Sequence, residues 1–499
     1  MKVASMAHIP WPRLVKCHRE TVPPYNWQEH IDYGPYREKW ELEGLWTLAR
    51  LCRTSSRLRV LAERALYSNL DLSDSRIRAR AFSAVRNSPR LAQHVQSLEL
   101  GEAYMTRGEF VVLTPPPGTT TNTTHETQRQ GSIPAFQQWF VDLLGAMHES
   151  PDFAEEFADA WPAYAITVMP SLKYLDITMP NDTVMLPSVF RGATKCDGKT
   201  REPQSHHSSQ GAAGKPSSPP VATGPPQPLS QLEEIIIRRV SEVKGALQMK
   251  SFEDLLLLPR LRKIYGFHVD LNTSVSIRTS RTSNSLVHVD LRDSLADAVH
   301  IMDLLRTCPL LRTLRVQWGD SMVGDSELEW HEVGRALTEY GSNLEVLDLD
   351  CRCCLNYEMG EWSGSLCSLK SLWHLKHLSL PLDILKGSED ELRELEVLTE
   401  SDEEEDGDGD CVGSKADPTG CLEELLPKPL ESLNLYSGYE EVDWLRKCVQ
   451  GVLSSRRLSS LSHVQLDGAE WLGLAVDETG WERKNTDMQL RFYRTKPTL

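Results

Sequence analysis

A short apolar pattern returns along this chain more regularly than any other feature. Its unit is apolar-x-x-apolar-x-apolar, as in the segments 95–100 and 172–177. The last two apolar positions share one face of a short strand, and the first belongs to the turn before it. The fourth position of the unit is occupied by Leu98, Leu175, Ile235, Ile264, Val289, Leu314, Leu347, Leu378, Leu433 and Val464.

The spacing of the copies identifies the type of repeat. From Ile235 to Leu378 successive copies are 29, 25, 25, 33 and 31 residues apart, near the range of about 20–29 residues that is typical of leucine-rich repeats. Between copies, the apolar period becomes helical over Asp293–Thr307, Glu327–Tyr340 and Tyr439–Leu453. One segment cannot bury its own apolar side, so neighbours must stack. We therefore predict an α/β leucine-rich-repeat solenoid (a horseshoe), with a parallel concave sheet and outer helices; the alternative is an unrelated α/β fold.

Charge is distributed unevenly. Between Glu389 and Asp410 there are thirteen acidic residues and one base, Arg393, which account for −12 of the formal charge of −17. Acidic runs of this kind are typical of solvated loops. The remainder is mildly acidic and has no basic stripe, so nucleic-acid binding is not expected. Residues 191–230 are rich in Ser, Pro and Gly and predict a disordered linker.

Composition also predicts the cellular compartment. The sequence has no apolar run of about 18 residues, as a membrane span requires, and its first residues do not resemble a secretory signal. Its eleven cysteines are scattered over a long chain, unlike a disulfide framework. We expect a cytoplasmic or nuclear protein that does not contact a membrane.

The sequence does not contain the common catalytic and metal-binding motifs. Phosphate-binding glycine loops, the Gly-x-Ser-x-Gly elbow and the His-Glu-x-x-His motif are absent from the sequence. The segment Cys351–Cys354, with Cys367 beyond it, lacks the second Cys-x-x-Cys pair of a zinc site and predicts buried thiols. We expect no enzymatic activity, no metal and no cofactor.

Two short helices are predicted before the repeats, separated by a break at Thr54–Ser56. Together with the following Leu70-Asp71-Leu72, they resemble the second half of an F-box, as found in fungal F-box/leucine-rich-repeat proteins. The opening Leu-Pro pair of that motif is not found upstream. The resemblance implies a substrate-recognition subunit of a cullin-based ubiquitin ligase. It also implies which residues of this chain contact the ligase adaptor: Leu45, Leu48, Leu51, Cys52, Leu58 and Leu61.

The partner of the concave sheet is expected to be a protein substrate, contacted by side chains that flank the strand leucines. The candidates are Tyr174, Asp176, Asp290, Arg315, Gln317, Trp318, Asp348, Asp350 and Asn434. The alternative is a protein-interaction scaffold without a ligase role, in which the two helices only cap the solenoid.

The predicted organisation has seven parts. They are an irregular N-terminal segment (1–40), the F-box-like module (41–72), the first irregular repeats (73–190), the linker (191–230), the central repeats (231–385), an acidic insert (386–425), and the C-terminal repeats with a cap (426–499).

Overall fold

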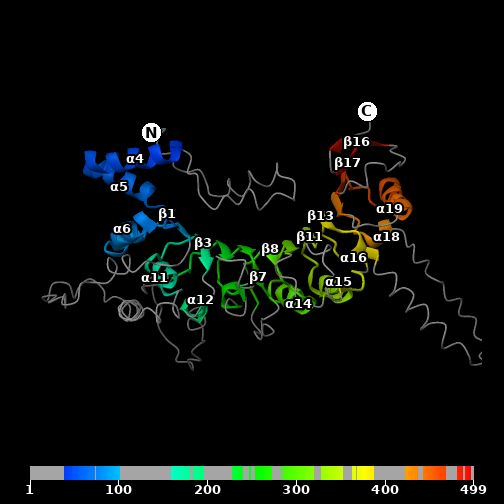
Figure 1. Cartoon of the computed structure of the whole chain (residues 1–499), viewed down its shortest axis with the longest axis horizontal. Coiled ribbons are helices and arrows are strands. Elements are labelled where there is room, and N and C mark those ends of the chain that lie inside the picture. The colour runs from blue at the N-terminus through cyan, green and yellow to red at the C-terminus, as the bar shows by residue number, and fades with distance from the viewer. Residues whose placement is uncertain are drawn as a thin grey trace, which may run out of the picture.

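A computed structural model shows a curved α/β molecule, in which a sheet follows the inner side of an arc and helices lie outside it (Figure 1). The predicted α/β class is confirmed. The structure describes residues 39–73, 75–101, 159–179, 183, 185–195, 228–239, 247–248, 253–271, 282–283, 285–319, 328–351, 362–366, 368–386, 422–436, 442–467, 480–486 and 489–495.

Thirteen of the described strands form one open sheet, and its first eleven are parallel and follow chain order. These eleven are β1 (Asn69–Asp71), β2 (Ser97–Leu100), β3 (Tyr174–Met179), β4 (Glu234–Arg239), β6 (Lys263–Phe267), β8 (His288–Ser294), β9 (Thr313–Trp318), β11 (Val346–Asp350), β13 (His377–Pro381), β14 (Ser432–Tyr436) and β15 (His463–Asp467). Two small parallel pairs lie beside the main sheet, β5 (Leu247–Gln248) with β7 (Val269–Asp270), and β10 (Leu328–Glu329) with β12 (Trp362–Ser363).

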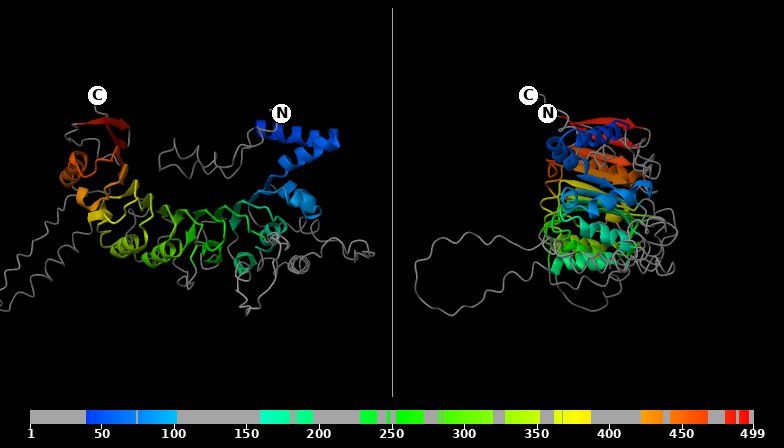
Figure 2. Two further views of the ribbon diagram at one scale, coloured as in Figure 1. Left: turned by 180° about the vertical axis from the view of Figure 1, so that it is seen from behind. Right: turned by 90° about the vertical axis from the view of Figure 1, so that its left-hand side faces the viewer.

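Helices cover the outer side of the arc, and the first two extend beyond β1 (Figure 2). Local sequence fixes their ends where a cap is present: the Asp297 carboxylate accepts from the backbone N–H of His300 at 2.9 Å, at the start of α14. The described helices are α4 (Lys39–Thr54), α5 (Ser56–Leu66), α6 (Ser75–Arg86), α7 (Pro89–Ala92), α11 (Ala160–Val168), α12 (Met185–Lys195), α13 (Glu253–Leu256), α14 (Ala298–Thr307), α15 (Trp330–Tyr340), α16 (Asp383–Lys386), α18 (Leu422–Leu425) and α19 (Val442–Ser454).

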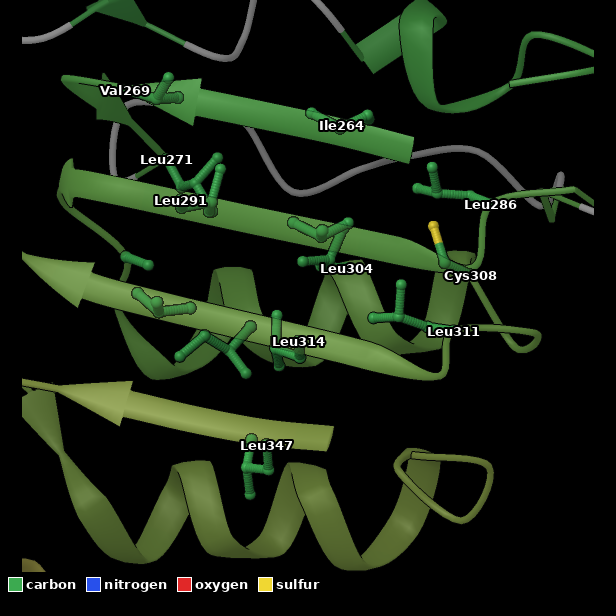
Figure 3. Packing of buried hydrophobic residues seen from close by; sticks show 14 of the residues in the cluster. Ile264, Val269, Leu271, Leu286, Leu291, Leu304, Cys308, Leu311, Leu314 and Leu347 are labelled. Atoms are coloured by element: carbon green, nitrogen blue, oxygen red, sulfur yellow. The ribbon is translucent and has the colours of Figure 1, made fainter. Parts of the chain in front are cut away.

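The repeated unit sets the register of the sheet. Its ten fourth-position residues stand side by side, each paired with its counterpart on the next strand. All ten are buried. Figure 3 shows Leu314 and Leu347 on neighbouring strands, with Leu304 of α14 on the side of Leu314 away from Leu347, and all three belong to one hydrophobic core. Burial of each such leucine contributes about 1.5–3 kcal/mol.

The turns before the strands stack as regularly as the strands themselves. The carbonyl oxygen of Val287 accepts from the backbone N–H groups of Arg312 and Thr313, at 2.9 and 3.1 Å. In the next segment the carbonyl oxygen of Arg312 accepts in the same way from Glu345 and Val346, at 2.7 and 2.9 Å. Each turn thereby satisfies backbone groups of its neighbour, which a single segment cannot do alone.

An antiparallel hairpin ends the sheet. It consists of β16 (Trp481–Thr486) and β17 (Gln489–Arg494), and β17 pairs with β15. Leu490 and Phe492 are buried against the last repeat, and the Trp481 indole N–H donates to the carbonyl oxygen of Leu453 at 2.9 Å. The hairpin covers apolar surface that the final repeat would otherwise expose.

Some of the predicted segment boundaries differ from those of the structure. Helix α4 begins at Lys39, inside the segment 1–40 that was expected to be irregular. Residues 191–195, placed in the linker, are the last residues of α12, and 422–425 of the insert form α18. The rest of the linker up to 227, and residues 387–421 of the insert, lie outside the described residues. Within the described part, no helix is long and apolar enough to cross a membrane.

Candidate protein-binding surfaces

The concave face consists of the side chains that alternate with the buried ones along β1–β15 and continue onto β17 and β16. Because side chains of a strand alternate between its two faces, positions flanking a buried leucine point to the inner side of the arc. The backbone register aligns these positions into rows that run across the strands. The middle row contains Asp71, Glu99, Asp176, Ile236, Tyr265, Asp290, Arg315, Asp348, Ser379, Asn434, Gln465, Arg491 and Lys484.

Opposite charges compensate one another at the centre of this face. Arg292 donates from Nε to Asp290 Oδ1 at 2.6 Å, and its Nη2 lies 3.9 Å from Asp348 Oδ2. Arg315 Nη1 lies 3.9 Å from Asp290 Oδ2. Burial alone would raise the pKa of Asp290, but the guanidinium groups of Arg292 and Arg315 outweigh it and hold that pKa below its usual value.

Uncharged polar groups follow toward the C-terminal end of the concave face. The hydroxyl groups of Ser379 and Tyr436 hydrogen-bond to each other, and the Asn434 side-chain amide donates to them at 3.3 and 3.2 Å respectively. The Tyr436 hydroxyl reaches Asp348 Oδ1 at 3.5 Å and so joins this group to the charged centre. This part of the face can hydrogen-bond to a partner without attracting charge.

Carboxylates dominate the N-terminal end of the same face. Asp71, Glu99 and Asp176 are neighbours on β1, β2 and β3 in the middle row. Asp176 is buried and pairs with Arg238 Nη2 at 2.6 Å. Burial raises the pKa of Asp176 to about 6, Arg238 opposes the rise, and the negative charge of Asp71 adds to it.

Aromatic and apolar side chains lie beside these carboxylates. Ile236 and Tyr265 occupy the middle row on β4 and β6, where an alternating pattern would usually place polar groups. The Tyr265 ring lies 4.9 Å from the His288 ring, and Arg238 lies 5.8 Å from the centre of the Phe267 ring. Arg238, Phe267 and Ile236 are site residues that were not predicted, although all three flank predicted strand positions.

Basic and aromatic groups occupy the C-terminal end. The rings of His463 and Tyr493 stack at 5.0 Å with an interplanar angle of 14°, and Lys484 Nζ lies 5.0 Å from the Tyr493 ring centre. Burial lowers the pKa of His463, and Arg491 and His377 lower it further. Arg491 and Lys484 end the middle row, so the row begins with acids and ends with bases.

Most of the predicted partner-binding residues lie on the concave face, and one does not. Tyr174, Asp176, Asp290, Arg315, Gln317, Asp348, Asp350 and Asn434 all flank buried positions of their strands.

Trp318 was placed on this face wrongly. It is 1% exposed, its ring packs edge-to-face on Trp330 with centroids 5.5 Å apart, and its indole N–H donates to the Ala296 carbonyl oxygen at 3.0 Å. It shares its side of β9 with Leu314 and Val316, because all three are an even number of residues apart.

A second candidate surface is formed by α4 and α5. Ser55 caps α5 by accepting from the Leu58 N–H at 3.1 Å, and Arg59 Nε donates to the Cys52 carbonyl oxygen at 2.9 Å across the break. Leu58 is 41% and Leu61 65% exposed, with Val60 beside them. Leu58 and Leu61 are three residues apart and so lie on one face of α5, and exposed apolar side chains grouped in this way are typical of an interface. Val60 was not predicted.

The other residues predicted to contact the adaptor are less exposed to solvent. Leu48 is buried, Leu51 and Cys52 are half-buried, and the side chain of Leu45 lies outside the described residues. Burial raises the pKa of the Cys52 thiol, and the nearby Glu63 adds to this effect. The exposed apolar area therefore comes from α5, while α4 supports it from behind.

Metal-ligating side chains gather at one place among the described residues. His331 Nε2 lies 3.6 Å from Glu329 Oε2 and 3.5 Å from Glu332 Oε1, at the start of α15. Glu332 also pairs with Arg335, and the group is largely open to solvent, as ordinary surface charges are. Cys308 and Cys351 are buried free thiols, whereas Cys353, Cys354 and Cys367 lie outside the described residues.

No family model matches the chain, and no curated protein matches it.

Proposed function

We propose that the chain is a leucine-rich-repeat solenoid that works by binding proteins, as an F-box-type substrate-recognition subunit of a cullin-based ubiquitin ligase. In this proposal the concave face binds the substrate and α4–α5 bind the ligase adaptor. The observation that carries the repeat assignment is the alignment of all ten fourth-position residues in one parallel sheet, in chain order. Stacked repeats of this kind present long concave surfaces to macromolecular partners.

The exposed apolar side chains of α5 support the adaptor role. A helix that only capped the sheet would turn its large apolar residues toward β1, yet Leu58, Val60 and Leu61 face solvent. Burying such a residue at an interface contributes about 1.5–3 kcal/mol. The half-buried face of α4 is then available to hold α5 in place.

Co-purification with the adaptor subunit tests this role in the full chain. We expect the wild-type chain to retain the adaptor and the double variant Leu58→Glu/Leu61→Glu to lose it by at least about tenfold, since each buried leucine is worth a tenfold change or more. The matched control is Val299→Glu/Leu310→Glu, which changes two other exposed apolar residues, on α14 and in the following turn. That control should retain the adaptor.

Two results would contradict the adaptor role. Equal retention by both double variants would place the contact elsewhere than on α5. Absence of the adaptor from wild-type preparations, under conditions that recover other F-box proteins, would favour a scaffold in which α4 and α5 only cap the sheet.

A further inference from the structure

Arginines are concentrated in the part of the chain before the second strand. Residues 50–94 contain ten arginines, no lysine and three acidic residues, which gives a net charge of +7 in a chain whose total is −17. Some of these bases are engaged within the fold: Arg78 donates from Nε to the Leu72 carbonyl oxygen at 2.7 Å, and Arg90 Nη1 pairs with Glu63 Oε2 at 2.6 Å. Because Glu63 is the acidic residue of α5, the arginines of that helix have no other carboxylate on it.

A stripe of four side chains runs along the outward side of α5 and is named here the arginine stripe. It stands at positions i, i+3, i+4 and i+7, which share one side of a helix, and consists of Arg57, Val60, Leu61 and Arg64. All four are exposed, whereas Ala62 on the other side of the helix is buried. Among the described residues, neither Arg57 nor Arg64 makes an ion pair or a hydrogen bond through its side chain. The stripe therefore presents two guanidinium groups and an apolar pair to a partner.

A pocket adjoins the C-terminal end of the stripe and is an independent feature. Its volume is about 360 Å³, and it lies where α5, the residues after α7 and the turn before β3 meet. Among the described residues no carboxylate lines it, and its lining consists of Arg64, Gln93, His94, Gln96, Pro170 and Ser171. Burial lowers the pKa of His94, and the positive charges of Arg90 and Arg64 lower it further, against a smaller opposing effect of Glu63. The pocket is therefore electropositive and suits an anionic oxygen.

The order of side chains along the stripe favours a protein over a membrane or a nucleic acid. On a helix that lies in a membrane surface, basic side chains flank an apolar face. Here Arg57 and Arg64 share one side with the apolar pair, so inserting that pair would desolvate both guanidinium groups. A nucleic acid offers a strongly polar interface and would leave the apolar pair without contacts. A protein segment that carries carboxylates and apolar side chains matches both kinds of group.

We propose that the arginine stripe and its pocket bind an acidic segment of a partner protein, whose carboxylates pair with Arg57 and Arg64 while its apolar side chains contact the apolar pair. A carboxylate that enters the pocket also meets the Gln96 amide and the Ser171 hydroxyl, which can donate to it. The inference deepens the proposed function by giving the chemistry of the partner on α5, and it rests on that function only in taking α5 as a binding surface.

The chain has acidic residues of its own that could compete for the stripe. They lie in 389–410, between α16 and α18. Figure 1 shows α16 and α18 at the opposite end of the arc from α5, which favours a partner protein as the occupant.

The probe is a fluorescein-labelled synthetic peptide with glutamates and leucines at helical spacing. Peptides of equal length with lysine in place of glutamate, or with serine in place of leucine, serve for comparison. Fluorescence anisotropy with the full chain, at about 0.15 M salt to screen distant charges, should show binding of the glutamate–leucine peptide. The serine peptide should bind more weakly and the lysine peptide should not bind. Labelled oligothymidylate and equimolar phosphatidylcholine–phosphatidylserine vesicles should also bind more weakly than the glutamate–leucine peptide.

Three double variants locate the contact. Arg57→Gln/Arg64→Gln removes both charges from exposed positions and should weaken binding of the glutamate–leucine peptide by about tenfold or more. Arg57→Lys/Arg64→Lys keeps the charges but loses the paired N–H groups, so its affinity should lie between that of the glutamine variant and that of the wild type. The matched control Arg312→Gln/Arg456→Gln removes two exposed arginines that lie neither on α5 nor at the pocket, and should leave affinity within about twofold.

Arginine modification by phenylglyoxal provides a readout that needs no variant. The bound glutamate–leucine peptide should protect Arg57 and Arg64 in the wild-type chain, as mapped by mass spectrometry. Arg312 and Arg456 should react equally with and without the peptide. Protection of the second pair but not of the first would overturn the inference.

Other results would also overturn it. They are absence of binding by the glutamate–leucine peptide, full affinity of Arg57→Gln/Arg64→Gln, and tighter binding of the oligonucleotide or the vesicles. A gain in affinity of about tenfold in Glu391→Gln/Glu394→Gln/Glu396→Gln would show that acidic residues of this chain already occupy the stripe.

Failure of the proposed function can be recognised separately. Absence of the adaptor from wild-type preparations would leave the peptide measurements unchanged. Full adaptor retention by Arg57→Gln/Arg64→Gln, together with its loss in Leu58→Glu/Leu61→Glu, would contradict the acidic partner and leave the adaptor role intact.

Discussion

Asp176 and Asp290 occupy the same row of the concave face and are both buried, yet their surroundings differ. Asp290 lies between Arg292 and Arg315, and the pKa of its carboxyl is lowered. Asp176 has Arg238 on one side and the negative charge of Asp71 nearby, and its pKa is raised to about 6. At neutral pH the ionised carboxylate of Asp290 therefore stabilises the folded chain, and that of Asp176 destabilises it.

The difference is one between individual sites, because Asp348, which lies at the centre of the face beside Arg292, also has its pKa raised by burial. A buried charge with good partners belongs to the scaffold, because removing a partner leaves the other charge exposed to a low dielectric. A buried charge without sufficient partners is a cost that folding alone does not explain, and such sites are candidates for binding. Variants that shift one aspartate toward the environment of the other test this distinction.

The largest effect is expected from Arg292→Met. The substitution removes the guanidinium that lies 2.6 Å from Asp290 and 3.9 Å from Asp348, and leaves both carboxylates buried with less compensation. We expect a loss of about 3–5 kcal/mol in the free energy of unfolding at pH 7, measured by urea denaturation. The loss should shrink in acid, where the two carboxylates are protonated.

The control for this variant is Arg312→Met. Arg312 pairs with Glu345 at 3.1 Å, but Arg312 is open to solvent and Glu345 is only half-buried, so the expected change is within about 1 kcal/mol. Equal losses in Arg292→Met and Arg312→Met would show that the central charges do not hold the concave face together.

Asp176→Asn should raise stability at neutral pH. Because the folded pKa of Asp176 is about 6, above its ordinary 3.8, the stabilisation it provides is present below pH 4 and is lost as pH rises through 6. The asparagine variant avoids that loss, so above pH 6 it should exceed the wild type by about 1–3 kcal/mol. Urea denaturation at several pH values measures the difference, which should vanish below pH 4.

Asp290→Asn is the matched substitution with the opposite sign. The lowered pKa of Asp290 means that its ionised form stabilises the fold at neutral pH, and that this contribution fades only when pH falls below its ordinary value. The variant should therefore be less stable than the wild type at pH 7. A stabilising effect of Asp290→Asn, or a destabilising effect of Asp176→Asn, would remove the contrast between the two sites.

The strands were predictable because their signal is local and repeated. Leu314, for example, has an apolar residue two positions later and another three positions earlier, and the same spacing fixes its neighbours in the sheet. The two-residue period of a strand also predicts the buried position of Trp318, because Trp318 lies four residues after Leu314 and therefore on the same side of the strand. The closing hairpin of β16 and β17 carries no copy of the unit, and its pairing was not predicted.

Charge compensation on the concave face was not predictable from single segments. Arg292 pairs with Asp290 in its own strand, but it reaches Asp348 only because β9 lies between β8 and β11. The number of basic side chains near an aspartate depends on how three strands are aligned in the sheet. The varying spacing of the repeat copies along the chain does not reveal which charged residues meet across those strands. The same reason kept Arg238 out of the predicted site.

The smallest expected effect separates two serines of the concave face. Ser379 hydrogen-bonds to Tyr436 and Asn434, so Ser379→Ala should lower the free energy of unfolding by about 1 kcal/mol. Ser97 has no side-chain partner among the described residues, so Ser97→Ala should change stability by less than about 0.5 kcal/mol, because no hydrogen bond is lost. Thermal denaturation of the two variants measures both changes. A loss at Ser97 as large as that at Ser379 would mean that its hydroxyl is already satisfied within the chain.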